Sequence, residues 1–435
     1  MQSSLYEAEV ALLSHEGRGI AHLGGKTTFI DGALPGERVR FRYTRKRRRF
    51  DEGVTVEVLE PAPMRIEPRC PHFGVCGGCN LQHLTPAAQV QHKQSVLLEQ
   101  LLHIGRVEPA PVLPPLTGPT WGYRHKARFS VKYVTKKGRL LLGFKEKGGR
   151  LVADLSRCEV LHPSVGLELD ELRACLESLS ISRHIPQIEV AVGEVTAALV
   201  IRHLSPLPAY DEERLKRYAE SHQVSIYVQL GGPETVRRLW PKDAKPLLYR
   251  LPAQGIEIHF KPTDFIQVNP AINRLMVSQV LKLLDLRPDE RVLDLFCGLG
   301  NFTLPMARHA AFVTGIEGDA ALIEGARRNA RSNGIDNVDF EVADLMDEHL
   351  EAPWRGGRFD KLLLDPPRTG ACEILGRLGF ERVKSIVYVS CNPATLARDA
   401  RILVHEKGFR LFAAGILDMF PHTAHVESMA LFGNG

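Results

Sequence analysis

The sequence lacks the features that mark membrane-spanning, secreted and repetitive proteins. No run of about 18 apolar residues occurs in the 435-residue chain, which excludes a transmembrane helix. Met1–Leu13 contains acidic residues and has neither a basic start nor a long apolar stretch, so we expect no secretory signal there. Eight cysteines are too few for a disulfide scaffold of this size, and no internal repeat or low-complexity tract is present. We therefore expect a protein of the reducing cytoplasm, where grouped cysteines more often bind metal or take part in catalysis.

The composition that remains is that of a globular protein, with 44% hydrophobic and 25% charged residues. The net charge is only +5, but eight basic residues and no acidic one occur between Arg38 and Phe50. Such a run is either a solvated charged loop or a phosphate-binding surface. Phe41, Tyr43 and Phe50 interleave with the basic residues, which favours nucleic acid as the partner.

The chain divides into three parts by its pattern of elements. Short strands separated by glycine and proline turns predict a small β-barrel over residues 1–62. An α+β middle domain is expected over 63–265, and it includes a helix near 86–104 that has Val90, Leu97 and Leu101 on one face. Strands alternate with helices over 266–435, which predicts a Rossmann-like parallel sheet with helices on both faces. The expected strands of this sheet are Arg291–Phe296, Phe312–Glu317, Val338–Val342, Lys361–Leu364 and Ser385–Ser390.

A glycine-containing loop follows the first of these strands. Asp294-Leu-Phe-Cys-Gly-Leu-Gly300 allows a sharp turn and a close ligand approach, and the next strand ends at Glu317, whose carboxylate can accept hydrogen bonds from ribose hydroxyls. The alternative is a plain tight turn. Because the loop lacks GxGxxG, S-adenosylmethionine is favoured over a dinucleotide, and the loop is similar in shape to motif I of the methyltransferases that use it.

Cys391 ends an apolar strand in the sequence Ser390-Cys-Asn-Pro393, at the edge that carries the glycine loop, and is a candidate nucleophile. The alternative is a small buried hydrophobic residue, which we prefer for the rival Cys297. Cys175 and Cys372 lie in no motif.

Asp365-Pro-Pro-Arg368 also suggests an amino-methyltransferase, but those enzymes have an aromatic residue in place of Arg368. The nearby cysteine favours methylation of carbon. C5 of uracil becomes nucleophilic when a thiolate adds to C6, and a base must then remove the C5 proton. Glu427, in Pro421-His-Thr-Ala-His-Val-Glu427, is the candidate base, and the alternative is a surface residue on the last strand.

Four cysteines have a spacing typical of a metal site. Cys70, Cys76 and Cys79 form C-x5-C-x2-C, and Cys158 follows much later. The residue types allow either tetrahedral zinc or a [4Fe–4S] cluster. Radical chemistry would require C-x3-C-x2-C and an open iron, and this spacing differs.

Five stretches resemble the RNA uracil-C5 methyltransferases, in particular the iron–sulfur enzymes that act on 23S ribosomal RNA, and the resemblance extends along nearly the whole chain. The first part is similar to a TRAM domain. The matching stretches are Phe265-Ile-Gln-Val-Asn269, Asp294–Thr303, Asp365–Arg368, Ser390–Arg398 and Met419–Glu427.

The resemblance implies S-adenosylmethionine-dependent methylation of C5 of a specific uridine in 23S ribosomal RNA through a covalent cysteine–C6 adduct. It implies Cys391 as nucleophile, Glu427 as base, Phe265 near the target base, and a [4Fe–4S] cluster on Cys70, Cys76, Cys79 and Cys158. The implied cofactor contacts are Gln267, Phe296, Asn301, Glu317, Asp344 and Asp365.

Two rival functions remain open at this point. A non-catalytic RNA-binding protein would not need Cys391, Asp365 and Glu427 together. A transfer-RNA methyltransferase is disfavoured because the family's transfer-RNA members lack both the barrel and the four cysteines. We expect 23S ribosomal RNA as the partner, neither DNA nor membrane, and a monomeric protein.

Overall fold

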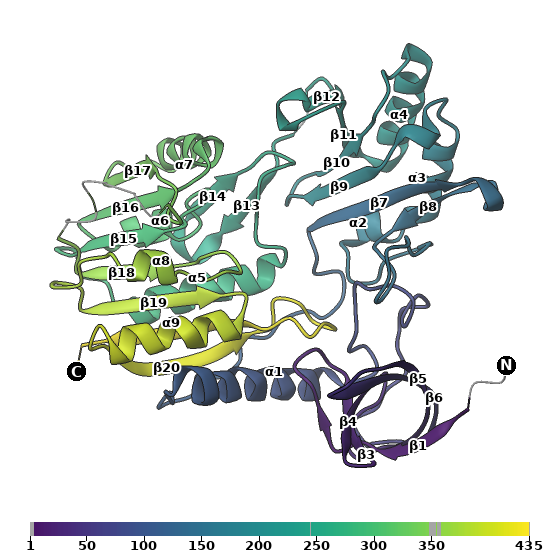
Figure 1. Cartoon of the computed structure of the whole chain (residues 1–435). Coiled ribbons are helices and arrows are strands. Elements are labelled where there is room, and N and C mark those ends of the chain that lie inside the picture. The colour runs from purple at the N-terminus through teal and green to yellow at the C-terminus, as the bar shows by residue number, and fades with distance from the viewer. Residues whose placement is uncertain (1–3, 244, 348–353, 355–357, 435) are drawn as a thin grey trace.

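The computed structural model describes residues 4–243, 245–347, 354 and 358–434 (Figure 1). Within these residues the strands form three large sheets and one hairpin. None of the helices in this part of the chain combines the length and the apolarity that a membrane crossing requires.

The N-terminal sheet closes into the small barrel that the sequence predicts (Figure 1). Its strand order is β1-β5-β6-β4-β3-β2. The two outer strands, β1 and β2, follow each other in the chain, so the two edges of the sheet lie close together. Val39 and Phe41 are fully buried in the barrel, while the alternating arginines of the same strand point outward. The strands are β1 (Tyr6–Glu9), β2 (Leu12–Leu13), β3 (Gly19–Leu23), β4 (Lys26–Asp31), β5 (Arg38–Lys46) and β6 (Phe50–Glu60).

The middle sheet has the order β12-β11-β10-β9-β7-β8 and packs against α3 and α4 in one apolar core. The strands of this sheet are β7 (Lys126–Val134), β8 (Arg139–Gly143), β9 (Gln187–Val192), β10 (Ala197–Arg202), β11 (Val224–Gln229) and β12 (Arg237–Trp240). The helices of this part of the chain are α2 (Pro163–Gly166), α3 (Leu169–Glu177) and α4 (Ala209–His222). A hairpin of β13 (Leu248–Leu251) and β14 (Ile256–His259) follows, and its apolar side chains join the core of the third sheet.

The C-terminal sheet contains the five predicted strands, running parallel in the order β17-β16-β15-β18-β19. Two further strands complete it, and β21 runs antiparallel to both β19 and β20, so the sheet is mixed. The strands are β15 (Arg291–Leu295), β16 (Phe312–Glu317), β17 (Val338–Val342), β18 (Lys361–Leu364), β19 (Ser385–Ser390), β20 (Arg410–Leu417) and β21 (Glu427–Gly433).

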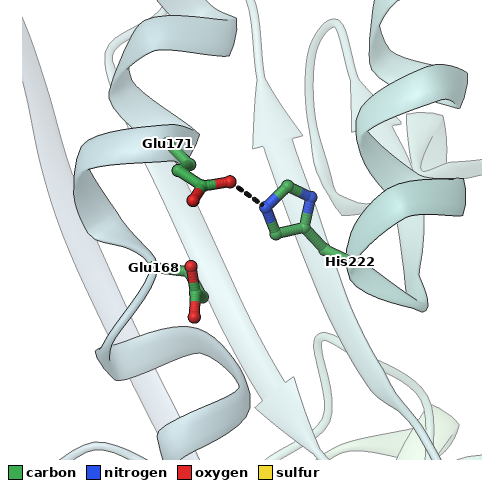
Figure 2. A group of neighbouring side chains, drawn as sticks. All are labelled: Glu168, Glu171 and His222. Carbon is green, nitrogen blue, oxygen red and sulfur yellow. Dashed lines mark hydrogen bonds and ion pairs between the residues drawn. The ribbon is translucent and has the colours of Figure 1, made fainter.

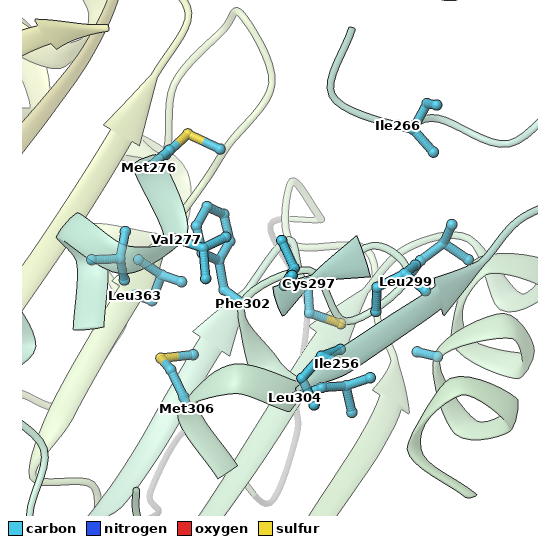
Figure 3. Packing of buried hydrophobic residues seen from close by; sticks show 14 of the residues in the cluster. Ile256, Ile266, Met276, Val277, Cys297, Leu299, Phe302, Leu304, Met306 and Leu363 are labelled. Atoms are coloured by element: carbon cyan, nitrogen blue, oxygen red, sulfur yellow. The ribbon is translucent and has the colours of Figure 1, made fainter. Parts of the chain in front are cut away.

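Helices cover both faces of this sheet, as expected (Figure 1). One face packs on α5 (Pro270–Leu284), α6 (Thr303–Ala307) and α7 (Ala320–Ser332), and the other on α8 (Cys372–Leu375) and α9 (Pro393–His405). Figure 3 shows the first face close by, where Phe302 and Met306 beside the glycine loop belong to the same buried cluster as Met276 and Leu363. This packing holds the glycine loop at the carboxyl edge of the sheet.

Helix α1 (Pro86–Gln100) and its continuation η1 (Leu101–Gly105) form the helix that the sequence predicts, but they pack on the C-terminal sheet. Val96, Leu97 and Leu101 are buried in the same core as α9 and β19. The domain boundaries at 62/63 and 265/266 remain a prediction, and part of the segment between them belongs by contact to the C-terminal unit.

Candidate active site

Strand pairing places Cys391 opposite Glu427. Ser390, at the end of β19, pairs with Ser428 of the antiparallel β21. The next positions along this ladder are Cys391 and Glu427, which are therefore neighbours although 35 residues separate them in the chain. The Ser428 hydroxyl also donates to the Ser390 carbonyl at 3.4 Å, which holds the two strand ends together.

Cys391 lines a cavity of about 580 Å³ whose walls come from distant parts of the chain. The floor is the start of α9, with Arg368 beside it. The remaining walls are His15 and Glu16 of the barrel, Gly77, Gly78 and Asn80 beside the cysteine motif, Val96 and Gln100 of α1, and Thr423–Val426. Such a space suits one flat ligand group next to the thiol.

Burial, with smaller contributions from neighbouring carboxylates, raises the pKa values of the acidic groups around Cys391. Burial raises the pKa of the Cys391 thiol to about 11, the carboxylates of Glu427 and Asp365 add to this, and Arg368 opposes it. Burial likewise raises the pKa of Glu427 to about 8, with a further contribution from Asp365, whereas Lys93 lowers it. The pKa of Asp365 is raised to about 7 by burial. The site therefore favours a cationic ligand, which would stabilise all three anionic forms.

The glycine loop has the geometry of a ligand-binding turn. Phe296, Gly298 and Gly300 have φ values of 67°, 54° and 89°, and a Cβ on Gly298 would meet no atom within 4 Å, so open space lies above it. The Glu317 carboxylate accepts hydrogen bonds from the amides of Gly298 (3.2 Å) and Asp319 (3.1 Å), which orient it at the loop. One oxygen of the buried Asp294 is bonded to Thr303 at 2.5 Å, and the other has no protein partner.

The other predicted cofactor residues occupy three places. Asn301 is held by Asn273 in two hydrogen bonds (2.8 and 3.0 Å) and by the Tyr249 hydroxyl (2.9 Å). Gln267 lines a cavity of about 200 Å³ together with these two partners of Asn301. Asp344 is exposed beyond β17, where its side chain accepts from the Met346 amide at 3.0 Å.

Phe265 is 69% exposed and lines a third cavity of about 1100 Å³ between the middle sheet and α7, not the cavity of Cys391. Cys297, in contrast, is buried in the core as the sequence analysis preferred.

The four grouped cysteines line one cavity, although Cys158 is 79 residues from Cys79. Burial raises the pKa of Cys79 to about 12 and that of Cys158 to about 11, and the negative charge of neighbouring cysteines adds to both shifts. Thiolates at these positions would need a bound cation to offset that cost. His72 fixes the loop by pairing with Ser156, two residues before Cys158, at 3.0 Å.

No three of the four cysteine sulfurs lie within 4.8 Å of one another in the described structure, as the ligand atoms of a single metal ion would. Among the described residues, the only group of three such ligand atoms within 4.8 Å of one another is that of Glu168, Glu171 and His222 (Figure 2). This group joins the start of α3 to the end of α4, and His222 contacts Glu171 at 2.7 Å. It is explained as a helix-to-helix ion pair, and it contains no cysteine.

Sequence reasoning missed the residues that hold the segment leading to Glu427. Lys93 is fully buried in α1, where it pairs with Asp418 (2.7 Å) and donates to the Phe420 carbonyl (2.8 Å). A signal existed, since position 93 lies on the same helix face as Val90 and Leu97, and a lysine on an apolar face needs a buried partner. Gln89, which bonds His422, had no such signal.

The basic run of the barrel divides into two sets. Arg38 and Arg40 form ion pairs with Glu7, Glu57 and Glu60. Arg42, Arg45, Arg48 and Arg49 are exposed and have no ion pair within the part of the chain that the structure describes. Of the two remaining basic residues, Arg47 pairs with Glu52, whereas Lys46 is exposed with no ion pair among the described residues. The second set and Lys46 are therefore available to bind phosphates.

Comparison with known proteins agrees with this arrangement. A family model described as tRNA (Uracil-5-)-methyltransferase matches residues 210–434, and a TRAM domain model matches residues 1–56. Three relatives are 23S rRNA (uracil(1939)-C(5))-methyltransferases RlmD, from Alkalilimnicola ehrlichii, Nitrosococcus oceani and Xanthomonas campestris. They are 56%, 56% and 53% identical over 98% of this chain and 96%, 95% and 97% of their own lengths.

A solved transfer-RNA enzyme shares the architecture of the whole chain, the barrel included, so the expectation that the family's transfer-RNA members lack the barrel is wrong for this one. It is the Pyrococcus abyssi tRNA (uracil-54, C5)-methyltransferase in complex with S-adenosyl-L-homocysteine, with a TM-score of 0.76 and 25% identity over 98% of this chain and 99% of that one. The barrel, the Cys391–Glu427 pair and these matches together show that the chain belongs to the RNA uracil-C5 methyltransferase family, with the RlmD proteins among its relatives.

Proposed function

We propose that the protein transfers a methyl group from S-adenosylmethionine to C5 of uracil 1939 in 23S ribosomal RNA. The observation that carries the proposal is that Cys391 lines a cavity large enough for a base, while the Glu427 carboxylate, beside the end of the same strand ladder, is close enough to raise the pKa of its thiol. Relatives that match nearly the whole chain at 53–56% identity are named for this reaction, which favours 23S ribosomal RNA over transfer RNA as the substrate.

The chemistry needs a nucleophile and a base on either side of one ring. The Cys391 thiolate adds to C6 of the uracil, which places the electron pair on C5 and its carbonyl. When bound, S-adenosylmethionine would supply an electrophilic methyl group to C5, with the S–CH3 bond breaking and S-adenosylhomocysteine as the leaving group. Glu427 then takes the C5 proton, the C5–C6 double bond re-forms, and the Cys391 thiolate leaves. The target base must be flipped out, because a stacked base hides C6 from the thiol.

The cofactor residues of this proposal are Gln267, Phe296, Asn301, Glu317, Asp344 and Asp365. Glu317 is oriented to accept hydrogen bonds from ribose hydroxyls, and Asp365 lies at the end of β18 beside the strand of Cys391. The three acids with raised pKa values fit a sulfonium cation, which supports this donor.

We assign Cys70, Cys76, Cys79 and Cys158 to a [4Fe–4S] cluster. A tetrahedral zinc ion with Zn–S bonds of about 2.3 Å would bring the sulfurs to within about 4 Å of one another. No three of these sulfurs are within 4.8 Å in the described structure, which supports a larger centre. The iron–sulfur cluster would stabilise the fold or position the RNA, because methyl transfer requires no electron. The expected cytoplasmic location and monomeric state belong to the same proposal.

The test uses a 23S RNA fragment that carries 5-fluorouridine at position 1939. Fluorine at C5 cannot leave as a proton, so the protein should stop as a covalent RNA adduct, visible on a denaturing gel in the presence of S-adenosylmethionine. Cys391→Ala should form no adduct while still binding S-adenosylmethionine. The matched control is Cys372→Ala, because Cys372 lies outside the cavity. An adduct in Cys391→Ala, or none in the wild type, would overturn the proposal.

A further inference from the structure

One residue joins the cysteine loop, which we define as residues 70–81, to two other parts of the molecule. Asn80 directly follows Cys79, and its side-chain amide donates to the Glu16 carbonyl in the barrel at 2.8 Å. Its side-chain oxygen accepts from the Ala424 amide at 2.8 Å, and its backbone amide donates to the His422 carbonyl at 3.0 Å. The barrel, the cysteine loop and the C-terminal segment therefore meet at one side chain.

The barrel turn is seated tightly on the cysteine loop. Gly17 has a φ of +79°, and a Cβ at this position would lie 2.7 Å from a methyl carbon of Leu81. Both the backbone conformation and the close approach require glycine here. The turn that contains Glu16 is thus held against Leu81 while Asn80 binds its backbone.

The segment 420–424, which leads to Glu427, takes most of its backbone partners from this region. The His422 carbonyl also accepts from Leu81 at 2.9 Å, and the His422 amide donates to Gln89 at 2.7 Å. His422 has a φ of +67°, a conformation that a non-glycine residue keeps only when its surroundings hold it. The shape of this segment therefore depends on residues 80–93, not on the sheet that follows it.

The residues that Asn80 connects are also walls of the substrate cavity. Asn80, Glu16 and Ala424 all line the cavity of Cys391. A displacement of the cysteine loop would move the barrel side and the C-terminal side of this cavity together.

We propose that Asn80 is a positioning residue that couples the four-cysteine centre to both walls of the uracil cavity. This inference rests on the proposed function for the identity of the substrate, whereas the coupling itself concerns the protein alone. It assigns the cysteine loop a role in building the active site: the bound centre would fix Cys79, and Asn80 would transmit that order to Glu16 and Ala424.

The first test needs no RNA. In the protein with its metal centre loaded, hydrogen exchange at 422–426 and 14–18 should be about tenfold faster in Asn80→Ala than in the wild type, since each lost bond protects an amide or its neighbours. The control is Asn337→Ala. Asn337 is also half-buried and makes three side-chain hydrogen bonds, but at the opposite edge of the C-terminal sheet. Unchanged exchange in Asn80→Ala, or the same increase in Asn337→Ala, would overturn the coupling.

The second test separates the two arms of Asn80. Asn80→Asp keeps the acceptor for Ala424 but loses the donor to Glu16, so we expect a KM for RNA raised about tenfold with an unchanged kcat. Asn80→Ala loses both arms and should lower kcat/KM by about 10-fold to 100-fold, with iron content, visible absorption and S-adenosylmethionine affinity retained. Loss of iron and of cofactor binding in both variants would show a folding residue instead, and wild-type kinetics in both would show no role. If the wild-type protein forms no adduct with fluorinated RNA, the proposed function fails, and the exchange experiment still decides the coupling.

Discussion

At the scale of single residues, the proposed role of Glu427 as the base makes its protonation state decide when the reaction can be completed. Burial and the Asp365 carboxylate raise the pKa of Glu427 to about 8, so the group holds a proton at neutral pH in the free protein. A base must be deprotonated to act, and the carboxylate fraction falls about tenfold for each pH unit below that pKa. Burial of Glu427 thus shifts upward the pH range in which this carboxylate could act as a base.

The rate of adduct breakdown should therefore rise with pH. With unmodified RNA in a single turnover, we expect the methylated adduct to decay about tenfold faster for each unit between pH 6 and 7.5, and to level off above about 8. Quenched samples on denaturing gels measure this decay. Glu427→Gln serves as the control and should accumulate adduct at every pH. A decay rate that is independent of pH across this range would exclude Glu427 as the base.

Sequence alone could nominate Cys391 and Glu427 as candidates because each lies in a short motif whose chemistry demands that residue type. It could not identify Lys93 or Asn80, because their roles come from partners more than 300 residues away in the chain. The apolar helix face around Lys93 shows that this lysine needs a buried partner but not which one, and Asn80 has no local signal at all. Only the folded backbone brings each residue to its partner. Spacing groups Cys70, Cys76 and Cys79, the family resemblance adds Cys158, and in the structure Cys158 lines the same cavity as the other three.

At the scale of elements, the hairpin of β5 and β6 divides one run of charge between its base, where arginines are paired, and its tip, where they are not. Arg38 and Arg40 pair with glutamates on neighbouring strands, whereas Arg45, Arg48 and Arg49 at the tip are exposed without an ion pair in the described part of the chain. The sequence allowed two interpretations of this run, a solvated charged surface and a phosphate-binding surface, and each describes one part of it. Glutamates neutralise Arg38 and Arg40 on the strand, whereas the arginines at the tip of the hairpin can still bind the phosphates of a polyanion.

Replacing Arg45, Arg48 and Arg49 by Gln should weaken RNA binding and make it less dependent on salt. Each phosphate contact contributes about 0.7–0.9 to the slope of log affinity against log salt concentration, so three lost contacts should reduce the slope by about 2. Filter binding between 50 and 300 mM salt measures it. The matched control is Arg38→Gln with Arg40→Gln, which should change the slope by less than about 1. Equal changes in both variants would show that the tip has no special role.

The sequence predicted the strands of the C-terminal sheet well, because each is a short apolar run between helices. It did not predict where α1 packs, because an apolar face shows that a helix is buried but not against which partner. The reversed direction of β21 also needs tertiary information, since direction depends on how β20 and β21 connect at the sheet edge. The local sequence pattern therefore predicts where helices and strands form, but only contacts between distant residues decide which hydrophobic core each of them joins.

At the scale of the whole molecule, the catalytic unit is assembled from two separate stretches of chain. Val96, Leu97 and Leu101 are buried beneath α9. Further along, the amides of Leu113 and Leu116 donate to carbonyls of β20 at 2.8 and 3.0 Å, which covers the edge of the sheet. Gly415 permits this approach, because a Cβ there would lie 2.7 Å from that of Leu113. The chain reaches the middle domain only after contributing this layer.

A fragment of residues 266–435 should consequently fail to fold alone. Burying three such side chains contributes about 5–9 kcal/mol, comparable to the about 5–15 kcal/mol that stabilises a whole domain, and the uncovered β20 would offer an edge for aggregation. A fusion that joins residues 86–118 to 266–435 through a flexible linker should recover a cooperative thermal transition in near-ultraviolet circular dichroism and bind S-adenosylmethionine. The same fusion with Leu97→Glu and Leu101→Glu should not. If residues 266–435 alone unfold cooperatively and bind the cofactor, α1 is not required for the C-terminal sheet to fold, and the boundary at 265/266 separates two independent units.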